Sequence, residues 1–325
     1  MNEIHLKEKQ FIVEEDGHGK RIDLYLAELM EGLTRSQLQR LIAEKKVLVN
    51  EGKVKANLKL KAGDMITYQS PAVPETTPLL PENIALEIIY EDDGLIVLNK
   101  PRGMLVYPAG AQKTGTLVNG LLYHCPGLSE IGEKHRPGIV HRLDKETTGL
   151  MVVAKKDKIH TDLVRQFKEG LVQKEYLALV HGVVSEPGGI IDAPIGRDLK
   201  NRQRMAVIFK NSKEALTKYQ VLERFLDYTL LRCQLETGRM HQIRVHLAYL
   251  QHPVVGDAKY LTPAFPKDQG KELGLEGQAL HAFSLSLIHP DSQERLNFTV
   301  NPPQDFLAAL HFLGSGFSET FEPEF

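Results

Sequence analysis

The stretch Gly138–Leu150 reads GIVHRLDKETTGL and stands between two apolar segments. Ile139 and Val140 lead into its polar part, and the apolar run 150–153 follows it. Between them lie charged and turn-forming residues with a single aspartate, Asp144. A polar loop held by two strand-like segments is a common place for chemistry, because a rigid frame positions its side chains. Asp144 is therefore the first candidate for a functional residue.

The composition predicts a soluble, globular protein that is large enough for two domains. The 325 residues suffice for a sizeable core, and 42% hydrophobic with 25% charged residues are ordinary for a folded chain. Residues 1–10 are polar and charged, unlike a signal peptide, and no later apolar run is long enough to span a bilayer. Cys125 and Cys233 form no CxxC pair. We expect a cytoplasmic protein whose two reduced cysteines are small core residues.

Charge is unevenly distributed along the chain, although the formal net charge is only -2. Residues 34–62 carry eight basic side chains and two acidic ones, whereas residues 261–325 carry three basic and nine acidic ones. A local basic patch attracts polyanions more effectively than the total charge indicates. The segment 34–62 is therefore a candidate nucleic-acid surface, with a solvated helix face as the alternative interpretation.

The basic segment has the pattern of a small α/β unit. Thr34 followed by Gln37 fits a capping box, which predicts a helix that begins near Arg35. Its apolar residues share one face, which leaves Arg35, Gln39 and Lys46 free to face solvent or a ligand. Further elements predicted in this part of the chain are a helix within 21–30 and strands at 47–50 and 62–68.

Residues 20–70 resemble the small RNA-binding module named after ribosomal protein S-four, which also occurs in tyrosyl-tRNA synthetases and in several RNA-modifying enzymes. The resemblance implies that the predicted helix contacts RNA. The candidate RNA-binding residues of this module are Arg35, Arg40, Lys45 and Lys46.

A proline-rich linker is predicted after this module. The stretch 70–83 contains four prolines and shows no hydrophobic periodicity, which indicates a stiff connection between domains. We expect an RNA-binding domain at 1–70, the linker at 71–84 and a larger domain at 85–325.

Strands outnumber helices in the larger domain. Two apolar runs around Asp93 and Gly94 have the signature of a β-hairpin. Further strands are predicted at 139–144, 150–156, 175–182, 228–238 and 279–290, and helices at 157–170, 240–250 and 303–313. This organisation predicts an α+β fold with a mixed, largely antiparallel sheet, not a regular βαβ repeat.

The motifs give no support to metal-dependent or nucleotide-dependent chemistry. His241 and His246 are five residues apart, which puts them on different helix faces, unlike the histidines of a zinc protease. We predict structural hydrogen-bonding roles for them and for His141. No phosphate-binding glycine loop and no serine nucleophile elbow occurs. A single aspartate in a loop is more often a turn or cap residue, and this is the alternative interpretation of Asp144. Together with a tyrosine and arginines, however, one carboxylate suits a reaction in which the aspartate is the nucleophile or the base and no cofactor is required.

The combination of motifs is more specific. Residues 141–156, HRLDKETTGLMVVAKK, closely resemble the signature of the RluA-type pseudouridine synthases. Further motifs of this family match Lys100–Pro108, Lys174–Gly182 and Thr237–Asp257, in the family's order. Tyr107 departs from the pattern, since many relatives have a histidine there. The resemblance covers nearly everything after the linker and implies a pseudouridine synthase catalytic domain at 85–325.

The resemblance implies a cofactor-free RNA pseudouridine synthase, and KETTGLM is similar to the RluD branch, which acts on large-subunit ribosomal RNA. Asp144 would be essential for detaching uracil from ribose C1′, either by attacking the sugar or by removing a sugar proton. Arg244 would pair with Asp144, because a guanidinium binds a carboxylate through two hydrogen bonds. Tyr176 would stack on the target base. Arg142 would fill the position that the flipped uridine leaves or hold the RNA backbone.

Further partners and alternatives follow from the same residues. The basic stretch 195–205 could bind phosphates, with a solvated loop as the alternative; its candidates are Arg197, Arg202 and Arg204. We expect a monomer that binds structured RNA and neither a metal nor a membrane. The alternative function is an RNA-binding ribosome-assembly factor without catalysis, and a metal-dependent RNA hydrolase ranks third.

Overall fold

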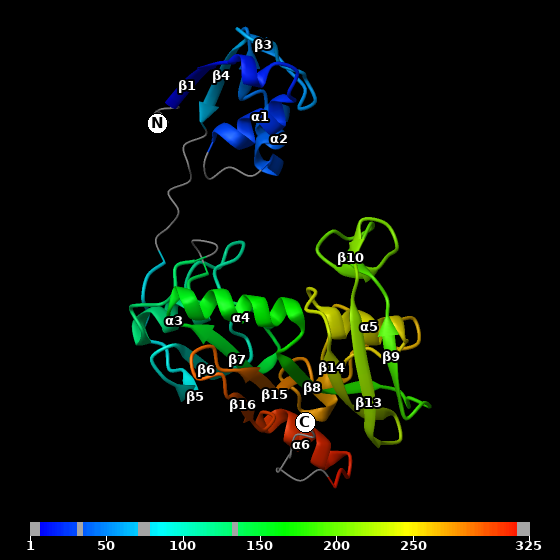
Figure 1. Ribbon diagram of the computed structural model, residues 1–325. Coiled ribbons are helices and arrows are strands. Elements are labelled where there is room, and N and C mark those ends of the chain that lie inside the picture. The colour runs from blue at the N-terminus through cyan, green and yellow to red at the C-terminus, as the bar shows by residue number, and fades with distance from the viewer. Residues whose placement is uncertain (1–6, 31–34, 71–78, 132–135, 317–325) are drawn as a thin grey trace, which may run out of the picture. The chain divides into compact units, whose positions relative to one another are not determined.

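The computed structural model describes residues 7–30, 35–70, 79–131 and 136–316 (Figure 1). The chain divides into two compact units, Met1–Pro78 and Leu79–Phe325. Most of the predicted linker, residues 71–78, lies outside the described residues. Among the helices described, none combines the length and the apolar character that crossing a membrane requires.

The first unit is an antiparallel sheet covered by two helices. The strands lie in the order β1 (Lys7–Ile12), β4 (Met65–Ser70), β2 (Val47–Val49) and β3 (Gly52–Lys53). A short 3-10 helix, η1 (Glu15–Gly17), precedes the helices α1 (Ile22–Leu29) and α2 (Arg35–Ala43). Both predicted helices and both predicted strands are confirmed, β1 was not predicted, and Thr34 of the predicted capping box lies outside the described residues.

Two side chains of α2 that were predicted to face solvent or a ligand also bind a carboxylate of this unit. Asp23 of α1 is fully buried, and its Oδ2 accepts hydrogen bonds from Arg35 Nε (3.0 Å) and Gln39 Nε2 (2.6 Å). A buried carboxylate requires such donors, because burial without partners is costly. Although burial raises the pKa of Asp23, its hydrogen-bond donors hold that pKa well below its ordinary value. Arg35, Arg40 and Lys45 are all exposed, so Arg35 both stabilises the fold and faces solvent.

The second unit is built on one large sheet. Its strands lie in the order β5-β6-β7-β15-β8-β14-β13-β9, and β16 pairs with β15. Their bounds are β5 Glu87–Glu91, β6 Leu95–Lys100, β7 Thr148–Ala154, β8 Gln173–His181, β9 Gly188–Asp192, β13 Leu216–Arg224, β14 Tyr228–Leu235, β15 Leu280–Ile288 and β16 Arg295–Thr299. Only β7 and β15 run parallel among the pairs described, so the predicted mixed, largely antiparallel sheet is confirmed.

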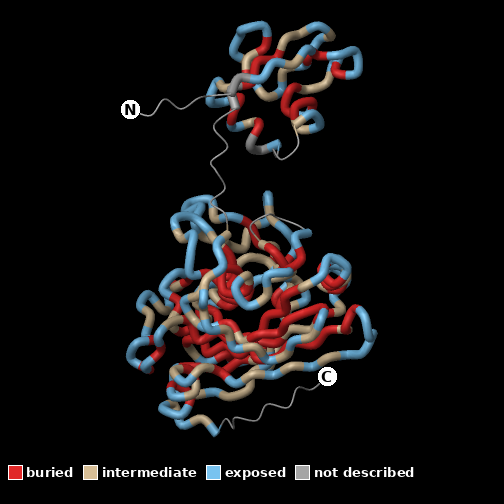
Figure 2. The backbone as a smooth tube through the Cα atoms, turned by 90° about the vertical axis from the view of Figure 1, so that its left-hand side faces the viewer, coloured by how far each residue is buried: buried red, intermediate tan, exposed pale blue. Residues whose placement is uncertain are grey.

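Helices pack against both faces of this sheet, and the strands carry the deepest burial (Figure 2). The helices α3 (Leu117–His124) and α5 (Gln242–Tyr249) share a hydrophobic cluster with one face, whereas α4 (Asp157–Glu169) and α6 (Gln304–Phe312) pack on the other. Alternation along β8 puts Tyr176 on the same face as α5 and Leu177 on the opposite face. The sheet thereby brings Tyr176 and α5 together.

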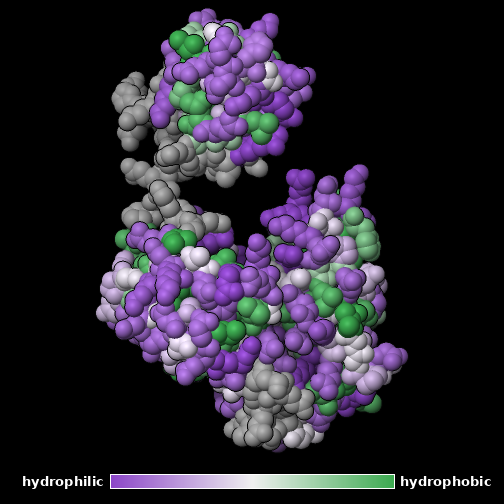
Figure 3. All heavy atoms as spheres, in the orientation of Figure 1, coloured by the Kyte–Doolittle hydropathy of each residue, from purple (hydrophilic) through white to green (hydrophobic). Residues whose placement is uncertain are grey.

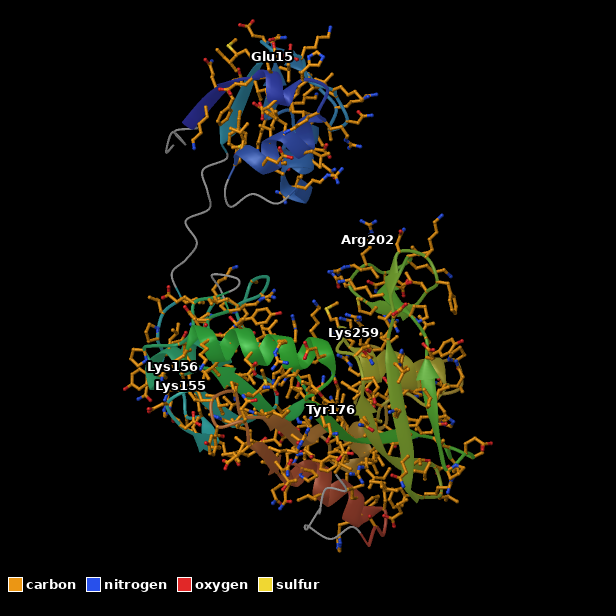
Figure 4. The ribbon with its side chains drawn as sticks, viewed as in Figure 1. Glu15, Lys155, Lys156, Tyr176, Arg202 and Lys259 are labelled. Atoms are coloured by element: carbon orange, nitrogen blue, oxygen red, sulfur yellow. The ribbon has the colours of Figure 1, made fainter. Side chains whose placement is uncertain are left out.

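A small three-stranded sheet projects from the large one, and we call residues 195–213 the arm (Figure 1). Its strands are β10 (Ile195–Arg197), β11 (Met205–Val207) and β12 (Ser212–Lys213). The base of the arm packs against α5 through a buried cluster that includes Ile195, Val245 and Tyr260. Hydrophilic side chains crowd its tip, where Arg202 is exposed (Figures 3 and 4).

Most predicted elements of the second unit are confirmed, but the strand predicted at 139–144 is wrong. This segment makes only one isolated bridge, between Ile139 and Val153. The N–H of Val152 donates to the imidazole of His141 (3.0 Å), so a side chain takes the place of a strand carbonyl. The segment is therefore an irregular loop. The sequence analysis also missed α3, the arm, β9, β13, β16 and the 3-10 helix η2 (Gly270–Leu273).

Candidate active site

The loop 139–147 is anchored by His141. The Nε2 atom of His141 accepts the hydrogen bond from Val152 of β7, and its ring stacks on Phe167 of α4 with centroids 4.7 Å apart. Burial lowers the pKa of His141 to about 3, so the ring is a neutral acceptor. The predicted structural role of His141 is confirmed by this hydrogen bond.

Lys100 fixes the same loop from the end of β6. Its Nζ donates to the carbonyl oxygens of Pro101 (2.7 Å), Met104 (3.1 Å) and Lys145 (3.2 Å), and the side chain is fully buried. Lys145 directly follows Asp144, so this contact holds the backbone next to the carboxylate. Sequence analysis did not assign Lys100 a role. The feature that could have indicated one is a lysine placed shortly after the apolar run 95–98.

Arg244 of α5 lies between two carboxylates. Its Nη1 donates to Asp144 Oδ2 (2.7 Å), while Nε and Nη2 donate to Asp257 Oδ2 (2.6 Å) and Oδ1 (3.0 Å). Although burial lowers the pKa of Arg244, the two carboxylates raise it above its ordinary value, so the guanidinium stays charged. The structure therefore contains the predicted pair of Asp144 and Arg244, but with one hydrogen bond, because the pair with two hydrogen bonds is formed with Asp257. Sequence analysis did not identify Asp257, the buried acid that holds the arginine.

Asp144 and Tyr176 line one cavity of about 380 Å³. Leu235 and Leu280 add apolar walls, and the Asp144 side chain is 15% exposed. The size is in the range of small-ligand sites, and a few polar groups in an apolar lining are typical of them. Burial and the charge of Asp144 raise the pKa of Tyr176, so its hydroxyl stays protonated at neutral pH. Figure 4 shows Tyr176 inside the second unit, on β8.

His241 also lines this cavity, although sequence analysis predicted only a structural role for it. Its Nδ1 lies 2.6 Å from the hydroxyl of Tyr260, and its Nε2 lies 3.8 Å from Asp144 Oδ1. Burial lowers the pKa of His241 to about 4, and Asp144 offsets only part of this shift. His246 is fully buried and bonds Thr217, which confirms its structural role.

Arg142 lies at the edge of the cavity and is held by Tyr107. Its Nη1 donates to the Tyr107 hydroxyl, and its guanidinium carbon lies 4.8 Å from the centre of the ring. The guanidinium of Arg136 lies over the same ring at 4.0 Å. The tyrosine that departs from the family pattern is thus a hydrogen-bond acceptor for the predicted base-flipping arginine.

The other predicted RNA-binding residues lie in two places. Arg35, Arg40, Lys45 and Lys46 belong to α2 and the turn after it in the first unit, and Arg197, Arg202 and Arg204 belong to the arm of the second. Within the described part of the chain, no group of three or more His, Cys, Asp or Glu side chains is arranged to hold a metal ion.

Three histidines that are partly or fully buried are neutral in the folded protein, so we expect the free energy of unfolding to fall as the pH is lowered from 7 to 5. Burial lowers the pKa of His141 to about 3, and those of His241 and His281 to about 4. In the unfolded chain these groups take up protons near pH 6.5, so acid favours the unfolded state by up to about 1.4 kcal/mol per pH unit for each. Chemical denaturation at both pH values measures this loss. An equal stability at pH 7 and pH 5 would contradict it.

A matched pair of variants tests which histidines are responsible. His141→Gln keeps an acceptor for the Val152 N–H and removes the titrating group, so the pH dependence should become weaker. The exposed His311 serves as the control, since His311→Gln should leave the pH dependence as it is in the wild type.

Comparison with known proteins assigns the two units to families. Residues 94–249 match the model of the RNA pseudouridylate synthase family, and residues 20–66 match that of the S4 domain. The chain is 46% identical over 299 residues to the uncharacterised RNA pseudouridine synthase YlyB of Bacillus subtilis, covering 92% of this chain and 96% of that protein. It is 45% identical over 300 residues to the ribosomal large subunit pseudouridine synthase D of Neisseria meningitidis serogroup B, covering 91% and 79%.

Solved structures agree with this assignment. The human RNA pseudouridylate synthase domain-containing protein 4 is 31% identical, with a TM-score of 0.55 over 70% of this chain and 93% of that one. The human domain-containing protein 1 is 30% identical, with a TM-score of 0.56 over 68% and 85%. The chain therefore belongs to the RluA-type RNA pseudouridine synthases, which isomerise uridine in RNA to pseudouridine, and it carries an RNA-binding S4 domain in its first unit.

Proposed function

We propose that the protein converts specific uridines of large-subunit ribosomal RNA into pseudouridine. The relative from Neisseria meningitidis is named for this RNA, and the alignment with it spans 91% of the chain. We propose residues 1–70 as the RNA-binding domain, 71–84 as the linker and 85–325 as the catalytic domain. No feature of the described site favours the alternative of a non-catalytic assembly factor, since Asp144, Tyr176 and Arg244 line the same cavity.

The observation that carries the catalytic proposal is the carboxylate of Asp144, which is held at a cavity by a charged arginine. In the isomerisation the bond from N1 of uracil to C1′ breaks and a bond from C5 to C1′ forms. The proton on C5 is lost and N1 gains one, so the composition is unchanged. Asp144 attacks C1′ or removes a sugar proton, and both routes need an oriented anion.

Arg244 supplies this orientation. It reaches Asp144 through one nitrogen only, because its other two nitrogens donate to Asp257. The Oδ1 atom of Asp144 is therefore not bound to Arg244, and its lone pairs remain available for the reaction in the cavity. A bidentate pair with Asp257 fixes the plane of the guanidinium, and the guanidinium in turn aims the reacting carboxylate.

Tyr176 is proposed to stack on the uracil ring. Its ring is buried at the cavity wall, where an aromatic face can cover a planar base. Because the pKa of Tyr176 is raised, its hydroxyl remains a proton donor and can take part in the proton transfer between C5 and N1.

The target uridine has to leave its stack to reach Asp144, at a cost of a few kcal/mol that is smallest in loops. Arg142 is exposed at the cavity edge, and we propose that it occupies or supports the vacated position. Tyr107 holds its guanidinium in place before RNA binds.

Release of tritium from RNA labelled at C5 of uridine tests the proposed substrate, because the isomerisation expels the C5 proton. Unmodified large-subunit RNA, small-subunit RNA and transfer RNA are incubated separately with the purified protein. Release is expected from the large-subunit RNA alone. Release from transfer RNA without release from large-subunit RNA would refute the proposed substrate but not the isomerase activity.

Replacing Arg40, Lys45 and Lys46 with glutamine should weaken RNA binding and flatten its salt dependence. Each phosphate contact that is lost reduces the slope of log K against log salt by about 0.7 to 0.9, so a loss of roughly 2 units is expected. Arg35 is left intact, because it stabilises the buried Asp23. Fluorescence anisotropy at several salt concentrations measures the slope.

A second variant controls for the loss of any positive charge. Lys158 and Lys271 are exposed lysines of the other unit, and their replacement with glutamine should leave the slope within experimental error of the wild type. An unchanged slope in the Arg40, Lys45 and Lys46 variant would mean that these residues form a solvated face.

A further inference from the structure

Tyr260 connects the cavity to the base of the arm. Its ring is buried, and the guanidinium carbons of Arg204 from the arm and Arg244 from α5 lie 5.0 Å and 4.9 Å from the centre of that ring. Its hydroxyl accepts a hydrogen bond from the backbone N–H of Met205 in β11 (3.0 Å) and lies 2.6 Å from Nδ1 of His241. The hydroxyl is thus held from two directions.

These partners determine where the hydroxyl proton goes. The Met205 N–H occupies one lone pair, and among the described residues the hydroxyl has no other partner than Nδ1 of His241. The hydroxyl therefore donates to Nδ1. A neutral imidazole that accepts at Nδ1 carries its own proton on Nε2. That N–H lies at the cavity, with Nε2 3.8 Å from Asp144 Oδ1.

The backbone of His241 adopts an uncommon conformation that supports this geometry. Its φ of 58° and ψ of 24° lie in the left-handed region, which is unfavourable for a residue other than glycine. Such conformations persist where the surroundings determine them, and they cluster at functional sites. His241 precedes α5, and its carbonyl accepts the N–H of Val245 (2.9 Å). The backbone of His241 therefore begins the first turn of α5, while its imidazole lines the cavity.

We propose that Tyr260 is a positioning residue of the reaction, because its hydroxyl fixes His241 as the tautomer with the proton on Nε2. This proton is directed at the carboxylate of Asp144 and at the ribose oxygens that bind beside it. In the other tautomer a lone pair would face the carboxylate and repel it. The inference rests on the proposed role of Asp144 and adds His241 and Tyr260 to the groups that support it.

Tyr260→Phe removes the hydroxyl and keeps the ring that contacts the two arginines. The single-turnover rate at saturating protein should fall about 10-fold, because the hydrogen bond that fixes the His241 tautomer is lost together with the one from Met205. The affinity for RNA should stay within about twofold, since the arm retains its charges. The matched control is Tyr228→Phe, a buried tyrosine of β14 whose hydroxyl bonds Gln269 (3.1 Å) and does not line the cavity. This control should react at the wild-type rate.

Nitrogen-15 NMR of the free protein reads the tautomer directly. The wild type should show His241 with its proton on Nε2, assigned as the signal that is lost in His241→Asn. Tyr260→Phe should show a mixture of both tautomers. Asparagine is chosen because it tolerates left-handed backbone. His241→Asn should also lose about 10-fold in rate. The double variant with Tyr260→Phe should show the same 10-fold loss, because Tyr260 acts on Asp144 only through His241.

Three results would overturn the inference. The first is a wild-type rate for Tyr260→Phe, the second is an unchanged tautomer in that variant, and the third is a double variant whose losses multiply to about 100-fold. These results differ from those expected if large-subunit RNA is not the substrate. The wild type would then release no tritium from large-subunit RNA, while the tautomer measurement on the free protein would be unaffected.

Discussion

Replacing Asp144 with asparagine should abolish pseudouridine formation while the protein still folds and binds RNA. Asparagine has nearly the same shape, but it can neither attack as an anion nor take up a proton. A loss of roughly 10²–10⁴-fold is expected if Asp144 acts as a base, and a larger one if it acts as a nucleophile. Single-turnover tritium release measures the rate, and anisotropy measures the affinity. Affinity should be unchanged or slightly tighter, because a carboxylate no longer meets the phosphate-rich ligand.

Stability should change little in this variant, since Arg244 keeps both hydrogen bonds to Asp257. Asp162→Asn is the matched control, because it removes a carboxylate from an arginine pair on α4 outside the cavity. The control should retain the wild-type rate. A folded Asp144→Asn protein that reacts at a rate near the wild type would exclude Asp144 as the catalytic residue.

Replacing Arg244 with methionine should both inactivate the enzyme and destabilise the fold. The change leaves Asp257, which is 2% exposed, as a buried carboxylate without its cation. Removing one partner of a buried ion pair typically costs 3–5 kcal/mol. Chemical denaturation should show a loss of about that size, and tritium release should fall to background. A stability within about 1 kcal/mol of the wild type would contradict the central place of this ion pair.

A double variant separates the two effects. Arg244→Met with Asp257→Asn removes the stranded charge, so much of the stability should return. Activity should stay absent, because nothing then orients Asp144. Recovery of activity together with stability would mean that Arg244 serves the fold alone. Arg244→Lys keeps a charge but not the planar fork that contacts both acids, so it should recover little of the rate.

The sheet of the second unit could be predicted from the sequence, because its strands carry a clear signal. Apolar residues fill both faces of β7 and β8, and the hairpin of β5 and β6 is marked by Asp93 and Gly94. The predicted strand at 139–144 failed for a physical reason. Ile139 and Val140 have strand propensity, but the hydrogen bond that would have paired this segment with Val152 is taken by the ring of His141.

The arm could not be predicted because its strands are short. β10 and β11 have three residues each. Their apolar side chains pack in a cluster with residues that lie 38 to 65 positions further along the chain, counted from Val207 to Val245 and from Ile195 to Tyr260. A short strand has almost no periodicity of its own. Its fold depends on those distant contacts, chiefly with Val245 and Tyr260.

The sequence predicted those candidate site residues that lie in recognisable family motifs. Asp144, Tyr176 and Arg244 each lie in a motif, and the sheet brings their three segments to one cavity. Their supporting residues were missed, because nothing in a sequence shows which carboxylate will face a buried arginine. Asp257 stands 13 residues from Arg244, and only the fold shows that they form a bidentate pair.

The same limit applies to the basic surface of the first unit. Helical periodicity correctly placed Arg35 and Gln39 on the face away from the apolar residues of α2. It could not show that Asp23 of the neighbouring helix lies against that face and binds both side chains. Charge patterning therefore does not show which exposed cation also stabilises the fold.

The most direct test is a map of pseudouridines in large-subunit ribosomal RNA from cells that lack the gene. Cells complemented with the wild-type gene and cells complemented with the Asp144→Asn gene are compared, with equal amounts of folded protein confirmed. The account predicts that specific pseudouridines disappear with the gene, return with the wild type and stay absent with Asp144→Asn. A map that is unchanged by loss of the gene, or one that Asp144→Asn restores in full, would contradict it.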